Sequence, residues 1–442
     1  MKVAFHTLGC KVNQYESEAM AEAFRREGYI VVDEREYANV YVINTCTVTA
    51  VADKKSRQYI RRMKKVNPDS IVVVTGCYAQ ISSDEVGAVQ GVDIVAGTNE
   101  KGRLTEYVKN FAEDRIKQIH IKGYEELDVY EETGCVTSTE NRTRAYIKVQ
   151  EGCNRFCTYC VIPYARGKVR SRELADIVSE AEALVRAGYK EIVLTGINTA
   201  LYGGEKAASP GIEEVIRAMD RIDGDFRIRL SSLEPAVVNA DYVKRLFKYD
   251  KLCHHMHLSA QSGSDRVLAA MNRPYSRKQY MEIVRALRDF DPHYGISTDI
   301  IAGFPGEKEA DFEESCSLVR ECDFCKTHVF KYSKRPFTKA AGMEGHVAPQ
   351  VKNRRSDGLQ EVGKEAADKF FVRCIGEEAF VLMEDIDEEK GIITGYADNY
   401  TRVYAEYDAG FDGRQFLNRF VRVVLTGTMR DGMKGRITTL EE

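Results

Sequence analysis

The sequence predicts an α/β protein built from three successive parts, and three observations support this prediction. Strand and helix patterns alternate with short connections over roughly the first 125 residues. A second alternating pattern begins at residue 144. Alternation of this kind is typical of parallel sheets covered by helices. From about residue 371, short β-branched and aromatic runs between glycine turns favour a small antiparallel β-barrel.

The first part, residues 1–125, is expected to be an open parallel sheet with helices on its faces. The apolar runs KVAFHTL, VYVINTC, IVVVTGC and VDIVAGT predict four strands. The segment QYESEAMAEAFRREG between the first two has Met20 and Phe24 on one helical face and ends at Gly28. The basic segment DKKSRQYIRRMKK is a second helix that directs Ile60 and Met63 inward.

The second part is expected to be a partial barrel that is open at one side. Residues 126–143 are polar and aperiodic and are predicted to be a linker. Residues 144–349 contain six strand candidates, RAYIKVQ, EIVLTGI, FRIRLSSLE, HMHLSAQ, GISTDIIAGF and KTHVFKYS, with helical patterns between them. Six β/α units are too few to close an eight-stranded barrel. Residues 350–370 are predicted to be a connecting helix to the last part, residues 371–442.

Composition narrows the functional class. An apolar content of 43% and a charged content of 30% are those of a soluble globular protein, and no stretch of about 20 uncharged apolar residues predicts a membrane span. The N-terminus starts on a strand pattern without a secretory signal, so a cytoplasmic location is expected. Twelve cysteines in such a protein favour metal ligands or catalytic groups over disulfide bonds.

Three of the predicted strands end at a cysteine: Cys10, Cys46 and Cys77. Ligands of an open parallel sheet bind at the carboxyl ends of its strands. We therefore expect these three thiols to meet at one edge of the sheet. Any one of them alone would be read as a small buried hydrophobe. Three at equivalent positions favour a shared ligand instead.

A second group, Cys153, Cys157 and Cys160, forms a C-x3-C-x2-C pattern directly after the strand RAYIKVQ. A structural zinc site needs four ligands, and no fourth Cys or His is nearby in sequence. Three thiolates suit a 4Fe–4S cluster with one iron left open for another ligand. A zinc site completed by a distant Cys or His remains the alternative.

The C-x3-C-x-aromatic-C motif, with Tyr159 as the aromatic residue, resembles the signature of the radical S-adenosylmethionine (SAM) superfamily. The whole chain resembles one branch of it, the methylthiotransferases. The resemblance implies a three-cysteine N-terminal domain, a radical SAM partial barrel and a C-terminal TRAM domain. It also implies that Cys10, Cys46 and Cys77 hold a second iron–sulfur cluster, of the 4Fe–4S type or a variant of it.

The resemblance further implies that the open iron of the cluster held by Cys153, Cys157 and Cys160 binds SAM. Reduction by an external electron donor then cleaves the SAM sulfonium to a 5′-deoxyadenosyl radical. The second cluster holds the sulfur, which another SAM methylates. Strand-end residues match SAM-contacting positions of the superfamily, with barrel packing as the alternative for each. These residues are Tyr159, Thr195, Gly196, Ser232, Glu234, Gln261, Ser262, Asp299 and Ile301.

The motifs LGCKVNQYESE, YVINTCTVT, DKKSR and VTGCYAQ resemble the tRNA branch that acts on N6-threonylcarbamoyladenosine at position 37. The implied product is the 2-methylthio nucleoside, and the implied partner is the anticodon stem-loop. Isopentenyladenosine in tRNA and an aspartate of a ribosomal protein are the alternative substrates. An RNA-binding iron–sulfur sensor without catalysis is the alternative from another functional class. Nothing in the sequence calls for more than a monomer.

Two basic segments near the expected site predict contacts with RNA phosphates. An ordinary solvated helix face is the alternative. The last part is acidic overall, with nine Lys and Arg against fourteen Asp and Glu, so a structural cap remains an alternative to an RNA-binding TRAM domain. The predicted RNA-binding residues are Arg57, Arg61, Arg62, Lys65, Arg166, Lys168, Arg170 and Arg172.

Overall fold

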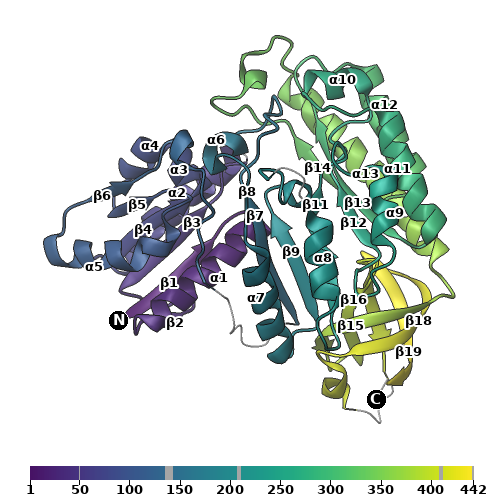
Figure 1. The fold of residues 1–442 in the computed structure, drawn as a ribbon. Coiled ribbons are helices and arrows are strands. Elements are labelled where there is room, and N and C mark those ends of the chain that lie inside the picture. The colour runs from purple at the N-terminus through teal and green to yellow at the C-terminus, as the bar shows by residue number, and fades with distance from the viewer. Residues whose placement is uncertain (49, 135–142, 207–210, 408–411, 441–442) are drawn as a thin grey trace.

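A computed structural model describes residues 1–48, 50–134, 143–206, 211–407 and 412–440. Three bodies follow one another along the chain, as Figure 1 shows: a sheet with helices, a larger helix-covered barrel and a small β-barrel at the C-terminus. Cys135, in the expected linker, lies outside the described residues. No described helix is long and apolar enough to cross a membrane.

The N-terminal body is a six-stranded parallel sheet in the order β2-β1-β3-β4-β5-β6. Every residue of β3 and β4, at its centre, is buried. The predicted inward residues Met20, Phe24, Ile60 and Met63 are all buried, on opposite faces of the sheet. The strands are β1 (Lys2–Thr7), β2 (Ile30–Val32), β3 (Val40–Thr45), β4 (Ile71–Gly76), β5 (Ile94–Ala96) and β6 (Gln118–His120). The α-helices are α1 (Lys11–Arg26), α2 (Ala50–Val66), α3 (Cys77–Ile81), α4 (Ser83–Gly87) and α5 (Leu104–Asp114).

The central body is the expected partial barrel, divided into two four-stranded sheets. They meet where β10 is followed, after Ser231, by β11. Its strands are β7 (Arg144–Glu151), β8 (Arg170–Ser171), β9 (Glu191–Gly196), β10 (Arg227–Leu230), β11 (Ser232–Leu233), β12 (His255–Leu258), β13 (Gly295–Ala302) and β14 (Lys326–Lys331). Its helices are α6 (Ile162–Arg166), α7 (Leu174–Arg186), α8 (Ile212–Asp220), α9 (Ala240–Leu246), α10 (Asp265–Ala270), α11 (Arg277–Phe290) and α12 (Glu309–Cys322).

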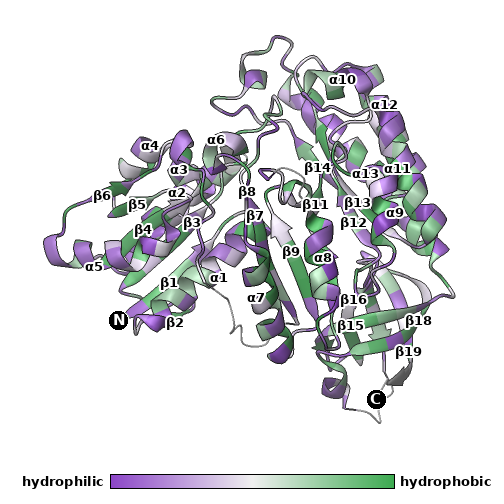
Figure 2. Ribbon diagram, viewed as in Figure 1, coloured by the Kyte–Doolittle hydropathy of each residue, from purple (hydrophilic) through white to green (hydrophobic). Residues whose placement is uncertain are grey.

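Hydrophobic packing explains these layers. Figure 2 shows apolar strands beneath helices whose outer faces are polar. The alternate residues Ala145, Ile147 and Val149 of β7 are buried in the core under α7 and α8, because successive strand residues point to opposite faces. On the other face, Tyr146 packs against Tyr15 and Ala19 of α1, so the N-terminal body lies against the first strand of the barrel.

The connecting helix α13 (Pro349–Arg373) leads into a closed barrel in the order β15-β16-β17-β19-β18. The predicted barrel is confirmed, although it is not wholly antiparallel, because β17 and β19 pair in parallel. Its strands are β15 (Glu378–Asp387), β16 (Ile392–Ala397), β17 (Arg402–Glu406), β18 (Phe420–Met429) and β19 (Gly432–Leu440).

The turn between β16 and β17 docks on the central barrel. Arg227 donates to the Tyr396 carbonyl at 2.9 Å, and Arg229 donates to the Asp398 carbonyl at 2.8 Å. A Cβ atom added at Gly295 would lie 1.9 Å from the Asn399 carbonyl oxygen, so only glycine fits there. The C-terminal barrel therefore closes the amino-terminal end of the central strands.

Candidate active site

The structure brings the three N-terminal cysteines to one edge of the first sheet. Cys10 precedes α1, Cys46 follows β3, and Cys77 begins α3 directly after β4. Because β1, β3 and β4 are neighbours, their carboxyl ends adjoin. Burial raises the pKa of Cys46, and its neighbours Cys77 and Cys10 raise it further. At Gly9, which has a φ of +114°, an added Cβ would lie 2.7 Å from the Cys46 Cβ. The backbone beside Cys10 can therefore approach Cys46 only as glycine.

A fully buried group of charged side chains lies behind this triad. Arg166 Nε donates to the Cys77 Sγ at 3.2 Å. The same guanidinium binds Glu16 of α1 and, at 2.7 Å, Glu151 of β7. It thus joins the N-terminal sheet to the barrel. Four bases surround the two acids, which leaves an excess of two positive charges: Arg166, Arg170, Lys101 and Lys148 against Glu16 and Glu151.

The second triad occupies the loop after β7. Cys157 accepts a hydrogen bond from Arg273 Nη1 at 3.3 Å, and the thiols of Cys153 and Cys160 interact with that of Cys157. Arg273 also lies 3.0 Å from the buried carboxylate of Glu234. Arg155 binds the other oxygen of this carboxylate at 2.8 Å. The two arginines outnumber the single acid, so positive charge is again in excess beside the thiols.

Both triads suit an anionic iron–sulfur cluster. Burial raises the pKa of Cys46 to about 12 and that of Cys153 to about 11, so ionisation of these thiols needs a bound cation or nearby positive charge. No group of three described His, Cys, Asp or Glu residues is arranged to hold a single metal ion.

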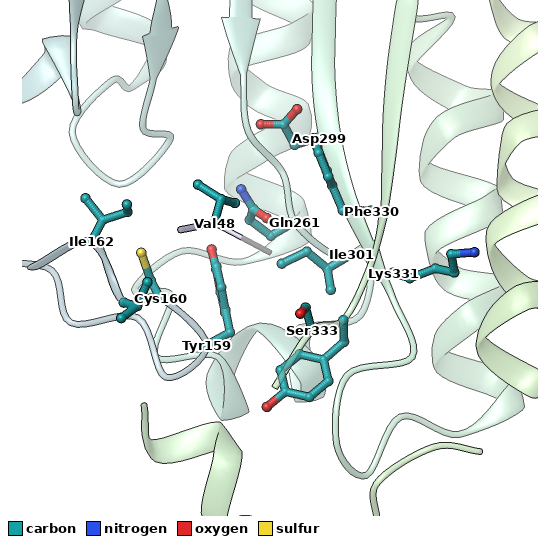
Figure 3. Close-up of a pocket in the computed structure, with 12 residues that line it drawn as sticks. Val48, Tyr159, Cys160, Ile162, Gln261, Asp299, Ile301, Phe330, Lys331 and Ser333 are labelled. Atoms are coloured by element: carbon teal, nitrogen blue, oxygen red, sulfur yellow. The ribbon is translucent and has the colours of Figure 1, made fainter. Parts of the chain in front are cut away.

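Two adjoining cavities open beside the second triad. One, of about 200 Å³, is lined by Tyr159, Gln261, Asp299 and Ile301 among other residues. Figure 3 shows these side chains around the cavity with Cys160, whereas Lys331 points away from it. The other, of about 150 Å³, is lined by Ser232 and Glu234, and it shares Tyr159 and Gln261. Six of the predicted SAM-contacting residues therefore lie together.

Three predicted cofactor-binding residues line neither cavity. Thr195 is buried within β9. At Gly196, an added Cβ atom would lie 3.0 Å from the Gln150 carbonyl oxygen. Ser262 is buried and accepts from the Ser264 backbone N–H. Barrel packing, the alternative interpretation of these positions, accounts for the burial of Thr195 and Ser262. Asn198, two residues after Gly196, lines the smaller cavity instead and donates to Glu234 at 2.8 Å.

Arg155 and Arg273 are the main residues that sequence reasoning missed. Arg155 stands between two cysteines of the motif, so its position was a usable signal. Arg273 belongs to MNRPYS after α10, and only the fold brings it to Cys157. Val48, from the loop after Cys46, also lines the larger cavity, so the N-terminal body contributes to the same site.

A buried ion pair fixes this loop to the barrel. Arg335, in the loop after β14, donates to Thr47 at 2.6 Å and to Asp53 at 2.7 Å. Both partners are close in sequence to Cys46. The pair therefore connects the loop of one triad to a loop that borders the cavity of the other.

Substituting Arg335 by alanine is expected to lower the free energy of unfolding by about 1–3 kcal/mol, because it leaves the buried Asp53 without its partner. Chemical denaturation followed by circular dichroism measures this change. The exposed Lys334→Ala variant is the matched control. Equal stability of the two variants would contradict the structural role of Arg335.

The structure corrects part of the predicted RNA surface. Arg166, Arg170 and Arg172 are at most 2% exposed and are held in ion pairs, so the prediction that they bind RNA is wrong. They lie at the interface between the two bodies, where arginine neutralises buried carboxylates. Arg61, Arg62 and Lys65 of α2 are exposed. Arg57 binds Glu85 at 2.8 Å, and Lys168 binds Glu125 at 2.6 Å.

Comparison with known proteins agrees with this geometry. Residues 2–97 match the model described as "Uncharacterized protein family UPF0004", and residues 147–319 match the radical SAM superfamily. Among solved structures, the radical S-adenosylmethionine methyltransferase TsrM from Kitasatospora setae has a TM-score of 0.58 at 16% identity. That match covers 77% of this chain and 76% of TsrM, and it shows the shared fold.

Curated relatives are similar over most of their length. Threonylcarbamoyladenosine tRNA methylthiotransferase MtaB of Bacillus subtilis is 44% identical over 91% of this chain and 89% of its own. The MtaB of Thermotoga maritima is 40% identical over 90% of each chain. The tRNA-2-methylthio-N(6)-dimethylallyladenosine synthase of Clostridium tetani is 33% identical over 97% of this chain and 94% of its own. Because relatives named as methylthiotransferases are 40–44% identical over nine-tenths of this chain, the chain belongs to the radical SAM methylthiotransferases.

Proposed function

We propose that this enzyme methylthiolates C2 of N6-threonylcarbamoyladenosine at position 37 of tRNA. The observation that carries the proposal is the 44% identity to MtaB of Bacillus subtilis across nearly the whole chain. Four relatives of that name are 35–44% identical. Relatives named as dimethylallyladenosine enzymes are 33–36% identical, which makes isopentenyladenosine the second candidate.

In this proposal Cys153, Cys157 and Cys160 hold one 4Fe–4S cluster, and Cys10, Cys46 and Cys77 hold another. When bound, the clusters and SAM would supply the radical and the methylthio group that the reaction needs. The chain contributes positive charge beside each triad, through Arg273 at Cys157 and Arg166 at Cys77.

The cavity residues are assigned to SAM by their chemistry. Glu234 is an acceptor for the amine or ribose, and Arg155, Arg273 and Asn198 fix its orientation. Gln261 adopts a left-handed backbone with a φ of +65°, and it lines both cavities. Strain of this kind is concentrated at functional sites.

Positioning is the other contribution of the chain. Val48 and Tyr159 line the same cavity although they come from different bodies. The Arg335 pair and the Arg166 cluster hold those bodies together. A fixed distance between two reactive centres removes the entropic cost of bringing them together during the reaction. An external electron donor, a monomeric state and a cytoplasmic location complete the proposal.

The test is the nucleoside content of tRNA from a strain that lacks the gene. Mass spectrometry is expected to find N6-threonylcarbamoyladenosine in place of its 2-methylthio derivative. A plasmid-borne copy restores the derivative, and so does Cys135→Ser, a cysteine outside both triads. A Cys77→Ala copy does not. Unchanged nucleoside content in the deletion strain rejects the substrate, and loss of the dimethylallyl derivative would select the second candidate.

A further inference from the structure

A row of aromatic rings crosses the loops beside the second triad. Tyr124, Phe156, Tyr164 and Phe337 follow one another with ring centroids 6.3, 5.7 and 6.2 Å apart. They come from four different segments of the chain. Phe156 lies between two cysteines of the triad, and Tyr164 lies on α6. Phe337 belongs to the loop after β14, which Figure 1 shows at the same end of the molecule as α6.

Two residues of the aromatic row, Tyr164 and Phe337, follow closely in sequence on residues that line the cavities. Ile162 lines both cavities, and Tyr164 is two residues further along α6. Ser333 lines the larger cavity, and Phe337 is four residues further along its loop. The Ala340 N–H donates to the Thr158 carbonyl at 2.8 Å, which ties the Phe337 loop to the loop of the triad. The aromatic row is thus fixed relative to the site.

Packing does not explain why Phe337 is aromatic. Its side chain is 65% exposed, and Tyr164 is 36% exposed. A single exposed ring is ordinary, but neighbouring exposed rings form an apolar patch of the kind that marks a binding site. Two of the four residues also adopt the left-handed backbone that favours glycine, with φ of +47° at Phe156 and +65° at Phe337. For bulky residues such angles are outliers, and retained strain of this kind points to function.

Charge at the Phe337 end indicates the partner. Lys334 and Lys339 flank Phe337 in the same loop and are exposed. Lys54 and Lys55 are exposed next to Asp53, which binds Arg335 of that loop. Within the described ranges, these four lysines form no ion pair. The Tyr124 end is different, because Glu125 and Glu126 are adjacent and exposed.

We propose that Tyr164 and Phe337 form a stacking platform for unpaired loop bases of the RNA, and that Lys334 and Lys339 contact the phosphates of the same strand. Bases of a single-stranded loop stack on aromatic side chains in a manner that tolerates any sequence. Phe156 and Tyr124 support the platform from behind. The inference rests on the proposed function, since it assigns these residues to the RNA that carries the modified adenosine.

The test uses the full chain with its clusters reconstituted anaerobically. Fluorescence anisotropy measures its affinity for a labelled RNA hairpin with an anticodon-sized loop and for the same stem as a blunt duplex. The key variant is Phe337→Gly, because glycine removes the ring and relieves the left-handed strain. Arg115→Gly is its matched control, since Arg115 also has a positive φ, of +58°, and is exposed.

Phe337→Gly is expected to weaken hairpin binding by roughly 10-fold, the effect of losing one stacked base, and to leave duplex binding unchanged. Phe337→Trp restores the affinity. The salt dependence of hairpin binding by Phe337→Gly stays that of the wild type. Lys334→Ala, in contrast, lowers the slope of log affinity against log salt by about 0.7. The iron content and the thermal midpoint of Phe337→Gly match those of Arg115→Gly.

Two results separate the possible failures. If the wild type does not bind the hairpin, the proposed function fails together with the platform. If the wild type binds and Phe337→Gly binds equally well, the platform alone is overturned, and the aromatic row is then a contact surface for a protein. An equal loss on hairpin and duplex also overturns it, because a duplex offers no unpaired bases.

Discussion

Replacement of Arg166 by alanine is expected to lower the free energy of unfolding by about 3–5 kcal/mol, the cost of breaking a buried ion pair from one side. Arg166 is fully buried, and it bonds Glu16, Glu151, Asn13 and the thiol of Cys77. Its loss removes one of the two bases that bind both carboxylates and leaves Lys148 as the other. Denaturant titration of the cluster-free protein measures the change independently of catalysis.

A matched control separates the effect of losing a buried partner from the effect of losing one positive charge. Arg61→Ala removes one positive charge from the exposed face of α2 and is expected to change stability by less than about 0.5 kcal/mol. A small effect at Arg166 would contradict the buried network. Iron content after reconstitution provides a second readout, since Arg166 contacts Cys77. The Arg166 variant is expected to retain the cluster of Cys153, Cys157 and Cys160 more firmly than that of Cys10, Cys46 and Cys77.

The same network predicts how stability depends on pH. Burial alone would raise the pKa of Glu16, but Arg166, Lys101 and Lys148 together hold it at about 2. A carboxyl group whose pKa is lower in the folded state stabilises the fold fully above its unfolded pKa, near 4.5. This contribution is lost as the pH falls from there toward 2. Denaturation midpoints measured across this range are expected to fall more steeply for the wild type than for Glu16→Gln.

Replacement of Cys157 by alanine is expected to abolish reductive cleavage of SAM. Cys157 is the thiol that Arg273 contacts, and its loss leaves two ligands for the cluster. We expect formation of 5′-deoxyadenosine to fall by more than about 100-fold, since removal of even an outer partner of a metal site costs 10- to 100-fold. Chromatography of reactions with dithionite and SAM measures the product.

The control for this variant is Cys316→Ala, a buried cysteine outside both triads. It is expected to keep both clusters and the SAM cleavage of the wild type. The Cys157 variant should retain the iron of the N-terminal triad only, which iron and sulfide analysis detects. Continued 5′-deoxyadenosine formation by Cys157→Ala would refute the assignment of the second triad.

The fold was largely predictable because its strands have long, regular patterns. The apolar runs that end at Cys10, Cys46 and Cys77 predicted neighbouring strands, and the sheet order confirms them. Strands β2 and β6 were missed because they are short and partly exposed at the sheet edges, whereas β5, equally short, is wholly buried and apolar. The parallel pairing of β17 with β19 depends on barrel closure, which local sequence does not encode.

The site was predictable where residues are close in sequence and not where the fold assembles them. The basic segment RGKVRSR was expected to bind RNA, yet Arg166, Arg170 and Arg172 are buried. A charge pattern does not reveal that Glu16, 150 positions earlier, supplies a counter-charge to Arg166. Arg273 and Arg335 were missed for the same reason, because their partners are distant in sequence.

The docking of the turn between β16 and β17 has a consequence for truncation studies. Arg227 donates to a carbonyl at the end of β16, and Arg229 donates to a carbonyl of that turn. The Lys11 Nζ, beside Cys10, lies 5.8 Å from the ring centroid of Tyr400. A chain shortened before residue 378 would leave the amino-terminal ends of the central strands uncovered, besides losing a C-terminal module. Inactivity of such a shortened chain would therefore report a destabilised central barrel as readily as a missing RNA contact.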